Sequence, residues 1–428
     1  MQPSKPNRIS IKNGQVFAAG QGFAQRDVFI ENDAIVAVGT APAHFDAQEV
    51  IDATGQLVLP GLIDLSAFLA EPGYGHKGNI ASETKAASRS GITTLCCTPD
   101  TKPVIDSPAV ANLIKEKNRA AGHCHVLPIG ALTQNLEGEQ LANMYGLKDA
   151  GCIALSNLLR PMANARVARQ CFRYAATYDI LVFINAQDYA LADGGCMHEG
   201  ATSTRMGLSG IPESAETLAI AQYLLLIEDT GVKAHFSQIT TARGLQMIRE
   251  ARQRGLKVSA DVALANLCFQ ASDVNGYNSM MHVQPPLRSE ADRAALLAGV
   301  NEGLLAICSH HRPHEVAAKM APFAASESGM STLDTFSAVI FTLIARGDLQ
   351  RDAAIAAVTS LPAAILGLEA GAVNNGGSAD ICIFNPEEKW QVSAQDLQSK
   401  GKNNPWLGDT LSGRVSHTLC AGRLVYSR

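Results

Sequence analysis

The groups best suited to chemistry in this chain are its 11 histidines and 10 cysteines. Imidazole and thiolate are common ligands of zinc and related metal ions. The densest cluster is His310-His311-Arg312-Pro313-His314, with Cys308 and His282 as further candidate ligands. One hypothesis is therefore a metal site built from His310, His311 and His314. Closed zinc sites need four convergent ligands, however, and adjacent histidines rarely converge.

Other reactive motifs are missing from the sequence. It has no Cys-x-x-Cys pair, and several cysteines stand in apolar, strand-like segments, where a free thiol behaves as a small buried hydrophobe. Ser66 is a conceivable nucleophile, but no Gly-x-Ser-x-Gly elbow surrounds it. The pattern therefore favours neither a disulfide framework, which is typical of small secreted chains, nor a serine nucleophile.

The elements that must position these groups alternate through the middle of the chain. Short apolar runs cover 61–66, 92–98, 124–130, 152–156, 181–186, 233–238, 257–262 and 304–309. Amphipathic helical stretches cover 107–121, 164–178, 214–230, 242–254 and 290–300. Buried parallel strands alternating with helices, eight in number, predict an α/β fold of the (β/α)₈ TIM-barrel type. A doubly wound open sheet is the alternative, but no Gly-x-Gly-x-x-Gly follows a strand.

The two ends of the chain are rich in β-strand patterns instead. Residues 9–16, which contain an Asn13-Gly14 turn signal, and 27–38 alternate in strand fashion, as do 379–385 and 415–426. We expect the two ends to pair into one small composite β-sandwich, and a helical tail over 331–368 to complete the barrel. The predicted units are 1–58, 59–369 and 370–428.

Composition excludes several classes of protein. The chain is 46% hydrophobic and 18% charged, which is an ordinary globular balance. Lys+Arg 35 against Asp+Glu 40, with no block of like charge, argues against nucleic-acid binding. The apolar run 218–227 is too short to span a membrane, and the polar N-terminus lacks a signal-peptide core. The expected location is the cytoplasm.

Several motifs resemble the amidohydrolase superfamily. Pro60-Gly61-Leu62-Ile63-Asp64-Leu65, continued by Glu71-Pro72-Gly73, resembles its dihydroorotase branch in particular. Further matching motifs are Gly91-Ile92-Thr93-Thr94, Thr98-Pro99-Asp100-Thr101-Lys102-Pro103, Gln284-Pro285-Pro286-Leu287-Arg288, His311-Arg312-Pro313-His314 and Gly377-Ser378-Ala379-Asp380-Ile381. The resemblance implies a barrel whose strand ends bind catalytic zinc.

The resemblance also implies that every zinc-site position is changed. A His-x-His pair is expected after the first strand, and an arginine and an asparagine are expected to bind the substrate carboxylate. Further metal-site positions follow strands four, five and six. A catalytic aspartate follows strand eight. Those positions hold, in order, Ser66, Phe68, Ala70, Asp100, Asn157, Asn185, Gln238 and His310. Hydroxyl, phenyl and amide groups are poor zinc ligands, and without zinc no hydroxide forms at neutral pH. We therefore expect no catalytic residues, no metal and no cofactor.

The resemblance is strongest to the non-catalytic dihydroorotase-like subunits that accompany bacterial aspartate transcarbamoylase. It implies a structural role in pyrimidine biosynthesis, with the transcarbamoylase catalytic chain as partner and a homodimer or larger hetero-oligomer as the assembly. The alternative is a divergent cyclic-amide hydrolase, of dihydroorotase, hydantoinase or allantoinase type, with a relocated metal site. A third hypothesis is a small-molecule sensor that kept the pocket but lost the chemistry.

Overall fold

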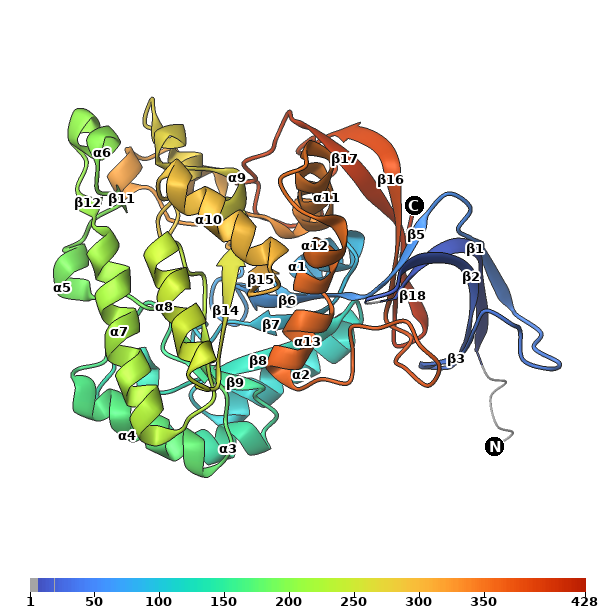
Figure 1. The fold of residues 1–428 in the computed structure, drawn as a ribbon, viewed down its shortest axis with the longest axis horizontal. Helices are drawn as coiled ribbons and strands as arrows, with labels where there is room; N and C mark the ends of the chain where they lie inside the picture. Colours follow the sequence, from blue (N-terminus) through green and yellow to red (C-terminus); the bar gives the residue numbers. More distant parts are fainter. Residues whose placement is uncertain (1–6, 19) are drawn as a thin grey trace.

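Two sheets organise the protein: a parallel sheet from the middle of the chain, and a second sheet from its two ends (Figure 1). This computed structural model describes residues 7–18 and 20–428. Residues 1–6 and 19, which belong to the predicted unit 1–58 and include most of the polar N-terminal segment, lie outside the described residues.

All eight apolar runs form strands of the parallel sheet, and their order across the sheet follows the chain. The strands are β6 (Leu62–Ala67), β7 (Ile92–Cys97), β8 (His125–Ala131), β9 (Ala154–Ser156), β10 (Val182–Ile184), β13 (Ala234–Phe236), β14 (Val258–Ala263) and β15 (Leu305–Cys308). Sequential parallel order with helical crossovers is the arrangement of a (β/α)₈ barrel. The predicted fold class is thus confirmed.

Polar groups of the strand-end loops join the first strand to the last. The Phe68 N–H donates to the His311 carbonyl at 2.9 Å, and the His311 N–H donates to the Ser66 carbonyl at 3.3 Å. The backbone N–H of Ser309 donates to the Asp64 carboxylate at 2.7 Å, and its hydroxyl donates to the same group at 2.5 Å. These bonds bring the end of β6 beside the end of β15, so residues after both strands face one site.

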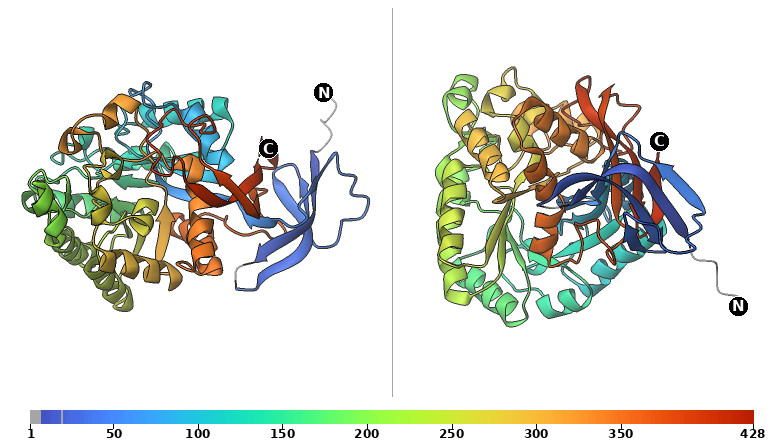
Figure 2. Two further views of the ribbon diagram at one scale, coloured as in Figure 1. Left: turned by 90° about the horizontal axis from the view of Figure 1, so that it is seen from above. Right: turned by 45° about the vertical axis from the view of Figure 1, so that its right-hand side comes forward.

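Helices cover the outside of the barrel, as Figures 1 and 2 show. They are α1 (Ile80–Arg89), α2 (Pro108–Ala121), α4 (Ala165–Thr177), α7 (Glu213–Thr230), α8 (Ala242–Gln253), α10 (Glu290–Asn301), α11 (Phe336–Arg346), α12 (Arg351–Ala357) and α13 (Ser360–Leu366). Side-chain caps define several starts: Asn164 accepts the Val167 N–H before α4, and Thr241 accepts the Gly244 N–H before α8. The five predicted helical stretches match their helices to within one residue at each end.

The two chain ends meet in one mixed sheet beside the barrel (Figure 2). Its strands are β1 (Arg8–Ala18), β2 (Gly22–Glu31), β3 (Ala34–Val38), β4 (Glu49–Asp52), β5 (Leu57–Pro60), β16 (Ile381–Gln391), β17 (Thr410–Cys420) and β18 (Arg423–Ser427). The expected pairing of the ends occurs where β5 lies antiparallel to β16. Residues from both ends, such as Ile11, Val28, Ile381 and Leu419, share one buried cluster, and their burial favours this pairing.

The predicted turn at Asn13-Gly14 is wrong. β1 runs through these residues, and its pairing with β2 shifts register between Ile11 and Gly14, which marks a β-bulge. Asn13 takes φ 62°, and a Cβ on Gly14 would lie 2.4 Å from the Val58 side chain. The Asn-Gly pair therefore forms a bulge within a continuous strand. Position 14 is a glycine because the close approach of Val58 leaves no room for a side chain.

Shorter elements fill the loops above the barrel and between strands. They are β11 (Met197–His198), β12 (Gly210–Ile211), α3 (Met144–Asp149), α5 (Tyr189–Ala192), α6 (Ala201–Met206) and α9 (Leu264–Cys268), with 3-10 turns at Gln134–Leu136, Ala271–Val274, Ser279–Met281, Val316–Lys319, Phe323–Ala325 and Leu333–Thr335. Within residues 7–18 and 20–428, every helix is too short or too polar to cross a bilayer.

Candidate functional site

A cavity of about 300 Å³ lies where the carboxyl ends of the barrel strands meet. This is the end of a (β/α)₈ barrel at which active sites are built. Five of the predicted positions line it, and so do residues from three further loops. The predicted ones are Ser66, Asp100, Asn185, Gln238 and His310, and the others are Leu158, Leu159, Arg160, Gln284, Arg312 and Ser328.

Two of the predicted zinc-ligand positions bind each other. The Asn185 amide Nδ2, just beyond β10, donates to Gln238 Oε1, beyond β13, at 2.5 Å. The Gln238 backbone N–H donates to Asp261 Oδ1 at 2.7 Å, and its left-handed φ of 50° follows the turn out of β13. Both side chains are buried, while Asn185 Oδ1 has no hydrogen-bond partner among the described residues. One buried amide oxygen of the pair is thus left without a hydrogen bond.

The first-strand positions do not act together. Ser66 lines the cavity, but Phe68 turns away and packs its ring 5.6 Å from that of Tyr74. The Arg312 guanidinium lies 5.3 Å from the Phe68 ring centroid on the cavity side, a cation–π contact. Ala70 is fully buried with φ 59° and does not line the cavity. A phenyl ring and a methyl group thus occupy the places where the resemblance puts a ligand and an arginine.

Asn157 also lies outside the main cavity. Its Oδ1 accepts the Thr133 hydroxyl at 2.7 Å, and its Nδ2 donates to the Leu136 and Arg160 carbonyls at 3.4 Å. It borders a second, smaller cavity together with Asn185. These bonds tie the end of β9 to the neighbouring loop, so the role of Asn157 here is structural.

Charge at the cavity comes from an ion pair. Asp100 Oδ2 lies 2.9 Å from an Arg312 guanidinium nitrogen. Burial acts to raise the pKa of Asp100, but the charge of the neighbouring Arg312 and its contact with the carboxylate outweigh it, so the Asp100 pKa lies below its usual value. Arg160 is the second cation that lines the cavity. Asp100 is therefore a carboxylate, already neutralised by Arg312.

Sequence reasoning missed Arg160 and Gln284 as cavity residues. Gln284 and Arg312 belong to two of the motifs named above, and these motifs could have indicated that both residues lie beside the site. Arg160 stands three residues beyond Asn157, and only the course of the loop after β9 brings it in. Arg288 is buried away from the cavity and binds Thr240 Oγ1 and the Ile211 carbonyl, so it braces loops.

The three clustered histidines do not form a metal site. His311 Nε2 pairs with Glu83 Oε2 at 2.9 Å, and its Nδ1 accepts the Thr332 N–H at 3.0 Å. His314 Nε2 donates to the Ser328 carbonyl at 2.9 Å. His310, with φ 46°, reaches the cavity, and burial and the nearby Arg312 lower its pKa to about 3. Across residues 7–18 and 20–428, these histidines do not converge on a common point, so the relocated site is not formed.

The donor set at the cavity does not fit a catalytic zinc. Such a site needs about three His, Asp or Glu ligands and a base for the bound water. The cavity offers a serine hydroxyl, two amides that bind each other, an imidazole and a carboxylate already paired with arginine. What these groups can do is donate and accept hydrogen bonds, since the Arg312 guanidinium is already paired with Asp100 and only Arg160 remains as a cation without that partner.

Comparisons with known proteins give the family. Residues 55–243 match a family described as dihydro-orotase-like, and residues 330–426 match the amidohydrolase family. A "dihydroorotase-like protein" of Pseudomonas aeruginosa is 47% identical over 420 residues, which cover 98% of this chain and 99% of the relative. A protein of Trichlorobacter lovleyi named "dihydroorotase" is 38% identical over 421 residues, at 98% and 99% coverage.

The chain belongs to the dihydroorotase-like family. The resemblance to the amidohydrolase superfamily is thereby confirmed. Among solved structures, the L-hydantoinase of Arthrobacter aurescens superposes with a TM-score of 0.87 at 20% identity, covering 98% of this chain and 96% of that one. The dihydropyrimidinase of Brevibacillus agri superposes with a TM-score of 0.83 at 21% identity, at 98% and 95% coverage. At such low identity these likenesses establish the barrel fold of this dihydroorotase-like chain and nothing further.

Proposed function

We propose that this dihydroorotase-like chain is a non-catalytic, cytoplasmic subunit that assembles with the catalytic chain of aspartate transcarbamoylase in pyrimidine biosynthesis. One observation carries the proposal. The cavity at the strand ends, where the family binds zinc, presents the hydrogen-bonded amides of Asn185 and Gln238 in place of imidazoles. A site with this donor set lacks both the metal-activated water and the base that ring hydrolysis needs.

The rest of the barrel supports a structural role. The eight strands and their covering helices enclose a large apolar core with members such as Phe172, Phe236 and Phe336 fully buried. Burying one such side chain contributes about 2–3 kcal/mol to stability. The chain therefore keeps a stable barrel although its strand-end cavity lacks a set of zinc ligands. Such a barrel can hold a partner protein in place.

The test is co-expression of the tagged chain with the transcarbamoylase catalytic chain of its own source. We expect the two to co-purify and to give one complex by native mass measurement. We also expect transcarbamoylase assembly or activity to fall when the dihydroorotase-like chain is omitted. The matched control expresses the transcarbamoylase with a tagged, unrelated barrel protein. Separate elution of the two chains at micromolar concentration would contradict the proposal.

A cyclic-amide hydrolase is the second candidate, because several relatives at 36–38% identity are named dihydroorotase. Purified protein supplied with zinc should then open the ring of dihydroorotate, a hydantoin or allantoin. We expect no turnover above the buffer blank with any of the three. Turnover that depends on a metal bound at the strand-end cavity would overturn the structural role in favour of this candidate.

A further inference from the structure

One group of histidine, aspartate and cysteine side chains converges far from the strand-end cavity. His125 begins β8, Asp380 immediately precedes β16, and Cys420 ends β17. Their ligand atoms all lie within 4.8 Å of one another, the only such group in the described part of the chain. Because His125 stands at the amino end of its strand, the group lies at the base of the barrel, against the sheet formed by the chain ends.

The carboxylate in this group is held in place by the surrounding chain. Asp380 Oδ1 accepts the Ala421 N–H at 2.8 Å and lies 3.3 Å from His125 Nε2. Asp380 Oδ2 accepts the Ser378 hydroxyl at 2.5 Å. The Cys420 thiol is buried and points to the Thr93 carbonyl at 3.8 Å. Ligand atoms from three segments distant in sequence are thus already close together, and only the thiol has to exchange its contact with Thr93 for the ion.

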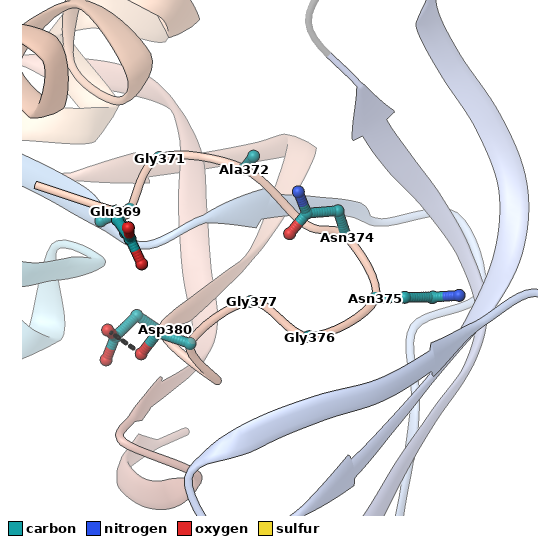
Figure 3. A pocket seen from close by; sticks show the side chains of 10 residues that line it. Glu369, Gly371, Ala372, Asn374, Asn375, Gly376, Gly377 and Asp380 are labelled. Atoms are coloured by element: carbon teal, nitrogen blue, oxygen red, sulfur yellow. Dashed lines mark hydrogen bonds between the residues drawn. The ribbon is translucent and has the colours of Figure 1, made fainter.

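A cavity borders this group on the side of Asp380. It measures about 560 Å³ and lies inside the loop 369–380, with Asp380 in its wall (Figure 3). Figure 3 shows the Glu369 and Asp380 side chains on the same side of that loop, while Asn374 and Asn375 follow on its far part. The His125 side chain is 44% exposed. Solvent therefore reaches two of the three ligands, His125 and Asp380, and a water molecule can occupy a fourth position beside them.

We propose that His125, Asp380 and Cys420 bind one divalent metal ion of the zinc type, which joins the base of the barrel to the terminal sheet. The ligand chemistry selects the class of ion. A thiolate with an imidazole favours zinc or cobalt over magnesium or calcium, which prefer oxygen ligands alone. Three protein ligands and a water complete tetrahedral coordination. On binding, the thiol proton and any proton on the imidazole pass to solvent, and the contact between His125 and Asp380 becomes a shared coordination.

The competing interpretation is a hydrogen-bonded His–Asp contact with a neighbouring thiol. Titration of the metal-free, full-length protein with Co²⁺ separates the two. We expect one equivalent to bind and to produce the near-ultraviolet charge-transfer absorption of a Co²⁺–thiolate bond, which Zn²⁺ then abolishes by displacement. We also expect the melting temperature to rise with Zn²⁺ concentration. Absence of the thiolate band would overturn the proposal.

Variants assign the ion to this group. Cys420→Ser should lose the thiolate band and the zinc-dependent rise in melting temperature, and His125→Gln should lose one-equivalent binding. Cys268→Ser in α9 and His310→Gln at the strand-end cavity are the matched controls and should retain both. If Cys420→Ser does not fold, the more exposed His125 still provides the test. Binding that survives both ligand variants overturns the proposal. If such binding is lost in His310→Gln, the metal lies at the strand-end cavity, and the proposed function is contradicted as well.

Discussion

The Asn185 amide donates to Gln238 Oε1 at 2.5 Å across the ends of β10 and β13. The family resemblance puts a histidine at each of these two positions. Here the Asn185 amide nitrogen bonds to the Gln238 amide oxygen instead, and Asp261 accepts the Gln238 backbone N–H. This hydrogen bond joins two side chains of the cavity wall. Its contribution to the stability of the protein can be measured.

Asn185→Ala should destabilise the protein. The substitution leaves Gln238 Oε1, on a side chain only 3% exposed, without its donor. An unmet buried acceptor costs about 1–3 kcal/mol, and water from the adjoining cavity should keep the loss near the lower end. Urea denaturation followed by circular dichroism measures it. Gln222→Ala on the exposed face of α7 is the control and should change stability by less than about 0.5 kcal/mol. Equal stabilities of the two variants would contradict the prediction.

Asp100→Asn should give the cavity an affinity for anions. In the wild type, Asp100 neutralises Arg312 at 2.9 Å, so an entering carboxylate meets a paired cation. The amide leaves Arg312 and Arg160 as two uncompensated charges in the cavity wall. Calorimetric titration with carbamoyl aspartate should detect binding only in the variant. Asp149→Asn, an exposed residue of α3, serves as the control. Wild-type binding as tight as that of the variant would show that the ion pair does not govern the cavity.

The barrel could be predicted because its signals are local. Each parallel strand is a short apolar run, and caps such as Asn164 and Thr241 fix where helices begin. The strand-end positions could be predicted for the same reason, since a residue just after a strand stands at the barrel mouth. The pairing of the two ends followed from their shared alternation.

The directions of individual side chains could not be predicted. Phe68 leaves the cavity to pack on Tyr74, and Asn157 turns to Thr133, because each finds a partner that only the folded loops supply. Arg160 enters the cavity through the course of the loop after β9. Asn13-Gly14 reads as a turn locally, yet the packing of Val58 against Gly14 makes it a bulge. These outcomes depend on contacts between distant segments, which spacing does not encode.

Glu83→Ala should be among the most destabilising single changes. Glu83 Oε2 lies 2.9 Å from His311 Nε2, and both side chains are fully buried. Burial acts to raise the pKa of Glu83, but the hydrogen bond and charge of His311 outweigh burial. The Glu83 pKa therefore lies below its usual value, and the group is a carboxylate. Removing one partner of a buried pair costs about 3–5 kcal/mol.

Guanidinium denaturation of Glu83→Ala, Glu83→Gln and the exposed α7 variant Glu228→Ala measures this cost. Glu83→Gln should lose less, since its amide oxygen can still accept the His311 Nε2–H. The variant on α7 should stay within about 0.5 kcal/mol of the wild type. A Glu83→Ala protein as stable as Glu228→Ala would mean that the buried pair contributes nothing to the fold.

Acid should destabilise the protein through its buried histidines. Burial, and then the Lys319 charge, lowers the pKa of His282 from 6.5 to about 4. Burial likewise lowers the pKa of His314 to about 4. Between pH 6.5 and 4 these histidines are protonated in the unfolded chain but remain largely neutral in the folded protein, so the free energy of unfolding rises with pH in this window. The stability of the folded protein is unaffected by these two histidines above about pH 6.5 and is reduced by them as the pH falls from 6.5 to 4. Each histidine should remove about 1–2 kcal/mol by roughly pH 5.

Melting temperatures of the wild type and of His282→Gln at several pH values test this dependence. The glutamine variant should be less stable at neutral pH but should lose less on acidification, because one titrating group is gone. Ser326→Ala removes only the hydroxyl that lies 3.0 Å from His282 Nδ1. It should lower the melting temperature while keeping the wild-type slope with pH. If His282→Gln instead keeps the full wild-type slope, the acid sensitivity arises elsewhere in the chain.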